Sequence, residues 1–166
     1  TDNERGWGFI VHRLDRERSG AMIFAKQKYH KEHLQEQFAA REVHRTYHAL
    51  VEGRPEEESG TINEWLLEDK FLRVKAVNKR NPQAREAITH WNIKDYDGTA
   101  SLIQLTIETG RRHQIRVGLA NLGCPVIGDT QHGATGNPIG RMALHATSLE
   151  FLHPENDDPV RFEAPI

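Results

Sequence analysis

The first candidate for a reactive group in the sequence is a carboxylate that is surrounded by arginines. Asp15 lies in the run His-Arg-Leu-Asp-Arg-Glu-Arg-Ser-Gly, residues 12–20, directly before an apolar segment. Neighbouring guanidinium groups favour the ionised form of a carboxyl group. A carboxylate that stays ionised at neutral pH suits nucleophilic attack at a sugar or base carbon. Taken alone, the run also fits a loop acid that only pairs with its arginines.

Two further stretches bring cations and an aromatic ring. Residues 109–116 read Thr-Gly-Arg-Arg-His-Gln-Ile-Arg, at the junction of an expected strand and an expected helix. A helix N-terminus with free backbone N–H groups and nearby arginines binds phosphate well. Tyr47 lies in the strand-like segment 45–53. By themselves these stretches are also explained by helix initiation with exposed cations and by a tyrosine that packs in the core.

The elements that must position these residues are mostly strands. Alternating residues over 86–96 and 99–109, joined by Asp97-Gly98, predict a hairpin. A short buried strand is expected over 21–26, and a longer one over 43–53. The segments 55–60 and 131–140 are expected loops, and 143–152 and 160–162 are short apolar runs.

Two helices are expected beside these strands. Residues 28–40 place apolar side chains near helical spacing. After Gly110, the residues Ile115, Leu119 and Leu122 repeat at helical spacing until Gly123 ends the helix. Several antiparallel strands with few helices predict an α+β domain built on a mixed, mainly antiparallel sheet.

Composition is that of a globular chain with segregated charge. The 166 residues suit one domain, 1–166, and 37% hydrophobic with 28% charged residues allow both a core and a solvated surface. The single cysteine, Cys124, suits a reducing compartment, so we expect a cytoplasmic protein with no membrane segment. Net charge is −2, yet basic residues gather in 10–31 and 110–118. This segregation fits a basic face on a near-neutral protein, which favours nucleic acid as a partner, and it fits ordinary solvated faces equally well.

Five motifs in one order carry a resemblance. His-Arg-Leu-Asp ends at Asp15 and is followed by the strand of Tyr47, by Gly110–Arg116, by Cys124–Asp129 and by Ala143–Ala146. Together they resemble the RluA-type pseudouridine synthases, whose pattern runs HRLD-x-x-(T/S)-S-G, K-x-Y-x-A-x-V-x-G, G-R-x-H-Q-I-R, P-(I/V)-x-G-D and A-L-H-A. The resemblance implies a pseudouridine synthase-like catalytic domain that acts on structured RNA, either rRNA or tRNA, without a cofactor.

The resemblance also implies roles for individual residues. Asp15 matches the catalytic aspartate, and Tyr47 matches a tyrosine that stacks on the target base and is a candidate for proton transfer. Arg116 matches an arginine that pairs with the aspartate, so we expect the two at hydrogen-bond distance, about 2.7–3.2 Å. Arg13 matches a residue that reaches into the RNA where the base has been extruded. The residues expected to bind RNA are Arg13, His12, Arg16, Arg111, Arg112 and His113.

The chain departs from the family pattern in places. Glu17-Arg18 replace the usual Asp-Thr, His132 replaces an aromatic residue, and Gly118 replaces a bulkier one. Family members generally have strands ahead of the aspartate loop, where this chain has only residues 1–11. We therefore expect a fragment or a natural truncation with an uncovered sheet edge. Such an edge predicts a dimer or a weakly stable monomer with reduced activity.

Two other classes of protein remain open. A non-catalytic RNA-binding relic fits the short N-terminal region but not the intact Asp15, Tyr47 and Arg116. A glycoside hydrolase would need a second carboxylate beside Asp15. No metal site is expected, because in the close pair His44/His48 the side chains stand about 13 Å apart on a strand.

Overall fold

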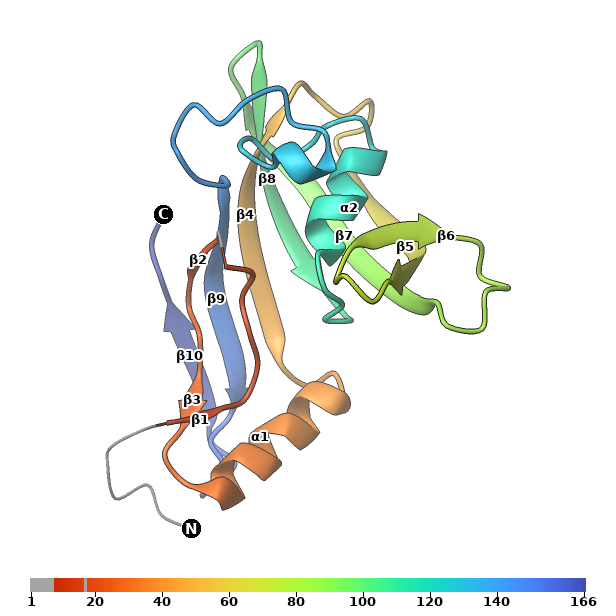
Figure 1. Cartoon of the computed structure of the whole chain (residues 1–166). Helices are drawn as coiled ribbons and strands as arrows, with labels where there is room; N and C mark the ends of the chain where they lie inside the picture. The colour runs from red at the N-terminus through yellow and green to blue at the C-terminus, as the bar shows by residue number, and fades with distance from the viewer. Residues whose placement is uncertain (1–7, 17) are drawn as a thin grey trace.

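The computed structural model describes residues 8–16 and 18–166. Within them, the main feature is an eight-stranded sheet in the order β10-β9-β4-β8-β7-β5-β6, with β2 beside β9 (Figure 1). Only β2 pairs in parallel, with β9, so the predicted α+β class with a mixed, mainly antiparallel sheet is confirmed. The strands are β2 (Ser19–Gly20), β4 (His44–Glu52), β5 (Ser59–Glu68), β6 (Val74–Val77), β7 (Arg85–Tyr96), β8 (Ala100–Ile107), β9 (Leu144–Leu152) and β10 (Pro159–Glu163).

The helices pack on different parts of this sheet. α1 (Lys28–Ala39) lies beside β9 with a small antiparallel pair, β1 (Phe9–Ile10) and β3 (Phe24–Ala25). α2 (Gln114–Asn121) packs against β5, β6 and β7 and contacts the 3-10 turn η1 (Thr130–His132). Figure 1 shows the two helices well apart, with β4 running between them. None of the described helices is long and apolar enough to cross a membrane.

Buried side chains form two large clusters. The larger one joins α2 to the central strands and includes Tyr47, Leu105 and Leu119. The second packs α1 against β9 and includes Leu34 and Phe151. Each fully buried side chain of this size contributes roughly 1.5–3 kcal/mol, so the larger cluster carries more of the stability. Strand β9 contributes Leu144 and Ala146 to the larger cluster and Leu149 and Phe151 to the second, so it connects them.

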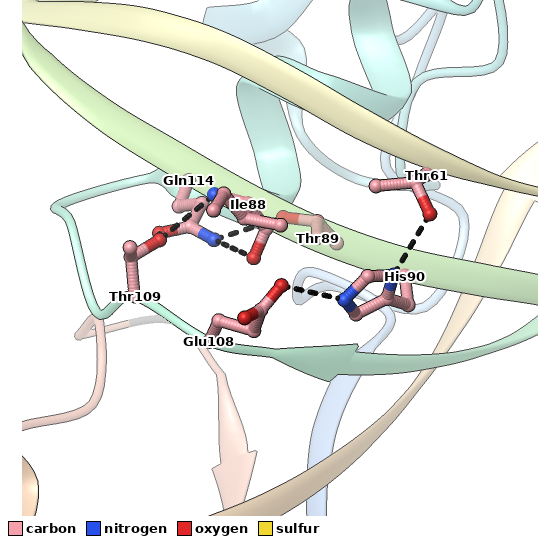
Figure 2. Close-up of polar contacts among 7 residues, drawn as sticks. All are labelled: Thr61, Ile88, Thr89, His90, Glu108, Thr109 and Gln114. Atoms are coloured by element: carbon pink, nitrogen blue, oxygen red, sulfur yellow. Dashed lines mark hydrogen bonds and ion pairs between the residues drawn. The ribbon is translucent and has the colours of Figure 1, made fainter. Parts of the chain in front are cut away.

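Polar contacts reinforce the sheet beside the larger cluster. His90 on β7 contacts the Thr61 hydroxyl on β5 through Nδ1 at 2.8 Å. Its Nε2 lies 2.8 Å from the carboxylate of Glu108, just after β8 (Figure 2). One side chain therefore links β5, β7 and the residue that follows β8.

Most of the expected elements are confirmed, and one is wrong. The helix over 28–40, the strand over 43–53, the hairpin over 86–109 and the helix after Gly110 all form. The buried strand over 21–26 does not, because the chain pairs with β9 earlier, at Ser19–Gly20, and the Ala21 N–H completes that pairing with the Ala146 carbonyl at 2.8 Å. Within the expected range, only Phe24–Ala25 forms a strand, which pairs with β1, and Phe24 is 54% exposed.

The outer strands of the described sheet are short. β10 has five residues and carries Pro159, Arg161 and Glu163, and β6 has four. Short, charged or proline-bearing outer strands discourage pairing with another chain. Close to β10, the apolar side chains of Phe24 and Phe162 are more than half exposed. The dimer or low stability expected from the sequence stays a prediction.

Candidate active site

A cavity of about 340 Å³ lies where the two clusters meet. Asp15 enters it from the loop after β1, Tyr47 from β4 and Arg116 from α2. We call the loop that carries Asp15 the aspartate loop. It contacts both clusters, since Val11 belongs to the second and Leu14 packs against the first. The three residues that the resemblance marks as catalytic are therefore brought together by elements far apart in the sequence.

Gln114 attaches α2 to the sheet. Its amide donates to the Ile88 carbonyl at 3.0 Å and to the Thr89 hydroxyl at 2.9 Å, both on β7. Its carbonyl oxygen accepts from the Thr109 hydroxyl at 2.7 Å (Figure 2). Gln114 is buried, so these hydrogen bonds are shielded from water, and they set the position of Arg116 two residues further on.

Arg116 is shared between two carboxylates. Its Nε and Nη2 donate to the two oxygens of Asp129 at 2.8 and 2.7 Å. Its Nη1 lies 3.7 Å from Asp15 Oδ2, an ion pair that is longer than the predicted hydrogen bond of about 2.7–3.2 Å. The side chains of Arg116 and Asp129 are 5% and 1% exposed, and that of Asp15 is 13% exposed. The expectation of a direct hydrogen bond between Arg116 and Asp15 is thus corrected to a looser ion pair.

Asp129 was not among the expected site residues. It lies in the motif Cys124–Asp129, but the sequence does not indicate that its partner is Arg116. A bidentate carboxylate holds a guanidinium in one plane, which is a strong and directional contact. Asp129 therefore determines which N–H of Arg116 faces Asp15.

His113 lines the cavity and lies beside a second histidine, His132. His113 Nδ1 lies 3.2 Å from His132 Nε2, and His113 has a left-handed backbone with φ 55°. Burial, followed by the nearby Arg116 guanidinium, lowers the pKa of His113 to about 4. Burial also lowers the pKa of His132. His113 is thus neutral at neutral pH and can hydrogen bond or stack, but it offers no positive charge to a phosphate.

His12 has a structural environment. Its Nε2 accepts a hydrogen bond from the Ile23 N–H at 3.0 Å, and its ring stacks on Phe38 with centroids 4.9 Å apart. Burial, assisted by Arg45 and Arg18, lowers the pKa of His12 to about 4. The neutral ring, with one nitrogen already hydrogen-bonded, therefore supports the loop that carries Asp15. The expected contact of His12 with RNA stays a prediction.

The expected RNA-binding arginines differ in their surroundings. Arg13 and Arg16 are exposed, and only Arg13 lines the cavity. Arg111 donates from Nε to the Glu86 carbonyl at 2.9 Å, and Arg112 donates from Nε to the Glu68 carboxylate at 2.8 Å. A neighbouring cavity of about 580 Å³ shares Arg13 and Arg111 with the first and adds Arg112. Arg112 thus lies outside the cavity that holds Asp15.

Comparison with known proteins identifies the family of this chain. Residues 3–121 match the family of RNA pseudouridylate synthases, so the chain belongs to that family, as the motifs predict. It is 38% identical over 158 residues to an uncharacterised RNA pseudouridine synthase of Bacillus subtilis, covering 94% of this chain and 52% of that protein. It is 36% identical over 171 residues to ribosomal large subunit pseudouridine synthase D of Xanthomonas campestris, covering 95% and 51%. The chain spans about half the length of these curated relatives.

A solved structure supports the same family. Human RNA pseudouridylate synthase domain containing 1 superposes with a TM-score of 0.83 at 25% sequence identity. The superposition covers 98% of this chain and 71% of the human one. The superposed part of this chain therefore includes nearly all of its fold.

Proposed function

We propose that this chain is a single catalytic domain, residues 1–166, of an RNA pseudouridine synthase that works in the cytoplasm. It isomerises specific uridines in structured RNA, either rRNA or tRNA, and needs no cofactor. The observation that carries the proposal is the placement of Asp15, which is the only carboxylate among the described residues that line the cavity. It lies opposite Arg116 and in the same cavity as Tyr47.

The reaction rearranges bonds within one nucleotide. The N1–C1′ bond of uridine breaks, the uracil rotates, and a C5–C1′ bond forms, while a proton leaves C5 and a proton is gained at N1. Nothing is consumed in this balance. The base must first leave the RNA stack, at a cost of a few kcal/mol, which contacts in the cavity offset. Tyr47, 3% exposed, is proposed to contact the extruded base.

Asp15 is proposed to act as the reacting carboxylate. Three routes use it: attack at C1′, addition to the base, or removal of a sugar proton to give a glycal. All three require the ionised carboxylate, which can pair with the Arg116 guanidinium 3.7 Å away. Among the described residues, Arg116 lies 3.7 Å from Asp15 and forms no bidentate pair with it, which leaves the oxygens of Asp15 available to the substrate.

Substitution of the aspartate tests this role. Asp15→Asn should abolish pseudouridine formation, measured by carbodiimide mapping of RNA treated with the purified protein. RNA affinity should fall less than about tenfold, because the carboxylate acts in the reaction more than in binding. The matched control is Asp157→Asn, an exposed aspartate with φ 57°, a conformation that asparagine also tolerates. Turnover of Asp15→Asn within tenfold of the parent protein would remove Asp15 from the mechanism.

A further inference from the structure

The cavity around Asp15 holds more positive charge than its acids neutralise. Besides Arg116, it is lined by Arg13, Arg18, Arg45 and Arg111. Asp15 is the only acid among the described lining residues, and it faces Arg116. The remaining cations thus face a space that the described acids do not fill.

Two of these arginines have unused donors. The Nε groups of Arg18 and Arg45 are buried, and neither has a hydrogen-bond partner among the described residues. The Arg18 guanidinium lies 5.2 Å from the centre of the Tyr47 ring, and the Arg45 guanidinium lies 5.2 Å from the centre of the Phe38 ring. Aromatic faces orient guanidinium groups without satisfying their N–H donors. Each group is therefore positioned but left with a free donor.

The two guanidinium groups also act on each other. Burial lowers the pKa of Arg45, the charge interaction and a side-chain hydrogen bond with Tyr47 raise it, and the charge of Arg18 lowers it. Like charges that are partly withdrawn from water are unfavourable unless an anion joins them. An anion that entered between them would relieve the repulsion and satisfy buried donors together.

Gly110 lets Arg45 occupy its position. A Cβ added at residue 110 would lie 2.8 Å from Arg45 Nη1, closer than such contacts occur. Gly110 itself lines the cavity, and it also lines the neighbouring one that contains Arg13, Arg111 and Arg112. Arg45 is thus held at the boundary of a continuous basic surface made of both cavities.

We propose that Arg18 and Arg45 form a subsite for a backbone phosphate of the RNA, at the nucleotide that enters the cavity. The planar guanidinium matches the geometry of phosphate oxygens, and the free Nε donors supply the contacts. The neighbouring basic cavity then takes the flanking backbone. This inference rests on the proposed function, because it takes RNA as the polyanion that enters the site.

Binding without turnover tests the subsite. The background protein is Asp15→Asn, and the probe is a single-stranded oligouridylate of ten nucleotides, with affinity measured over a series of salt concentrations. Arg45→Gln and Arg18→Gln should each weaken binding roughly tenfold, the size expected for a charge-assisted hydrogen bond. Each should also reduce the slope of log affinity against log salt by about 0.7, the value for one lost phosphate contact on a single strand.

Matched variants separate this subsite from general charge effects. Arg161→Gln removes the same charge from an exposed arginine that is paired with Glu150 and Glu163, so affinity and slope should not change. Arg45→Lys keeps the charge but loses the planar group, so the slope should be kept while affinity falls in part. Gly110→Ala should weaken binding like Arg45→Gln by displacing the guanidinium. Circular dichroism and thermal melts verify that each variant is folded.

A chemical change in the probe completes the test. Methylphosphonates replace the phosphates one at a time, which removes the charge from a single linkage. At one linkage the penalty of Arg45→Gln should vanish, because the parent protein has then lost the same contact. A penalty of equal size at every linkage, or equal losses for Arg45→Gln and Arg161→Gln, would overturn the subsite.

The outcome for the subsite is independent of the outcome for the reaction. Pseudouridine formation by the parent protein is measured separately by carbodiimide mapping. Binding that depends on Arg45 at one linkage, with no pseudouridine formed, would refute the proposed function and keep the subsite. Pseudouridine formation by the parent protein, together with an unchanged salt slope in Arg45→Gln, would support the proposed function and refute the subsite.

Discussion

Arg116 makes different contacts with its two carboxylates, and the difference suits the proposed chemistry. Asp129 accepts two hydrogen bonds at 2.7 and 2.8 Å, whereas Asp15 lies 3.7 Å away. A carboxylate held in a bidentate pair is strongly bound and has little freedom to react. Because Asp129 takes that position, Arg116 faces Asp15 without forming a bidentate pair with it.

This division of roles predicts the effect of removing the charge of Asp129. Asp129→Asn should lower kcat at least about tenfold with a smaller change in KM, because Arg116 is released toward Asp15. It should also lower the free energy of unfolding by about 3 kcal/mol, since a buried guanidinium loses its counter-charge. Steady-state kinetics and denaturant unfolding measure the two effects, with Asp157→Asn as the control. A loss of stability with kcat unchanged would show that Asp129 only supports the fold.

The sequence predicts the composition of the site better than its contacts. Asp15, Tyr47 and Arg116 were expected together, and they line one cavity. Asp129 lies in the motif Cys124–Asp129, yet nothing in the order of residues tells which of two acids contacts a given arginine. Arg45 was likewise visible beside Tyr47, but its buried free donor depends on Gly110 and α1, which only the folded chain brings near.

At the scale of elements, the two-residue strand β2 positions the aspartate loop. Gly20 has φ 124°, a conformation open to glycine, and a Cβ there would lie 2.2 Å from the Ala146 carbonyl oxygen. The His145 ring, one residue away on β9, is 2.8 Å from the Ser19 hydroxyl. This close approach to β9 is possible because residue 20 has no side chain.

Gly20→Ala should therefore displace the loop that carries Asp15. The expected result is a clear fall in melting temperature and a loss of pseudouridine formation of more than about tenfold, from backbone strain together with the clash. Gly136→Ala is the matched control, because a Cβ at that position meets nothing within 4 Å. Normal melting and normal activity of Gly20→Ala would mean that β2 is not needed to place Asp15.

Elements with strong periodicity were predictable, and elements defined by tertiary pairing were not. α1, β4 and the hairpin of β7 and β8 follow from their own patterns. β5 was missed because it buries only Leu66 of its ten residues, so its alternation between inside and outside is weak. The strand expected over 21–26 was misplaced because the pairing of β2 with β9 depends on a glycine contact rather than on apolar alternation.

At the scale of the whole molecule, the active-site cavity lies on a boundary. Phe38 of α1 lines it from the side of the smaller cluster, and Ile115 of α2 lines it from the side of the larger one. The chain passes from Val43 in the smaller cluster, one residue before β4, to Tyr47 of β4 in the larger. The distance between Asp15 and Arg116 therefore depends on how firmly the smaller cluster is held to the sheet.

The smaller cluster should open before the rest of the molecule. α1 buries only Leu34 and Gln37 among its twelve residues, its N-cap Gln27 makes no side-chain hydrogen bond, and β1 and β3 have two residues each. Segments with few buried apolar contacts open locally at lower free energy. In hydrogen exchange we expect the amides of α1 and β3 to exchange well before those of β7 and β8.

Substitution within this cluster tests the prediction and its effect on the site. Leu34→Ala should destabilise the α1 region by about 2–4 kcal/mol, because a buried leucine leaves a cavity. Exchange in α1 and in the aspartate loop should accelerate and kcat should fall, while protection of β7 and β8 persists. Leu50→Ala, at a leucine that is 43% exposed on β4, is the control and should change neither. If α1, β7 and β8 lose protection together in Leu34→Ala, the molecule unfolds as one unit and the cavity has no weaker side.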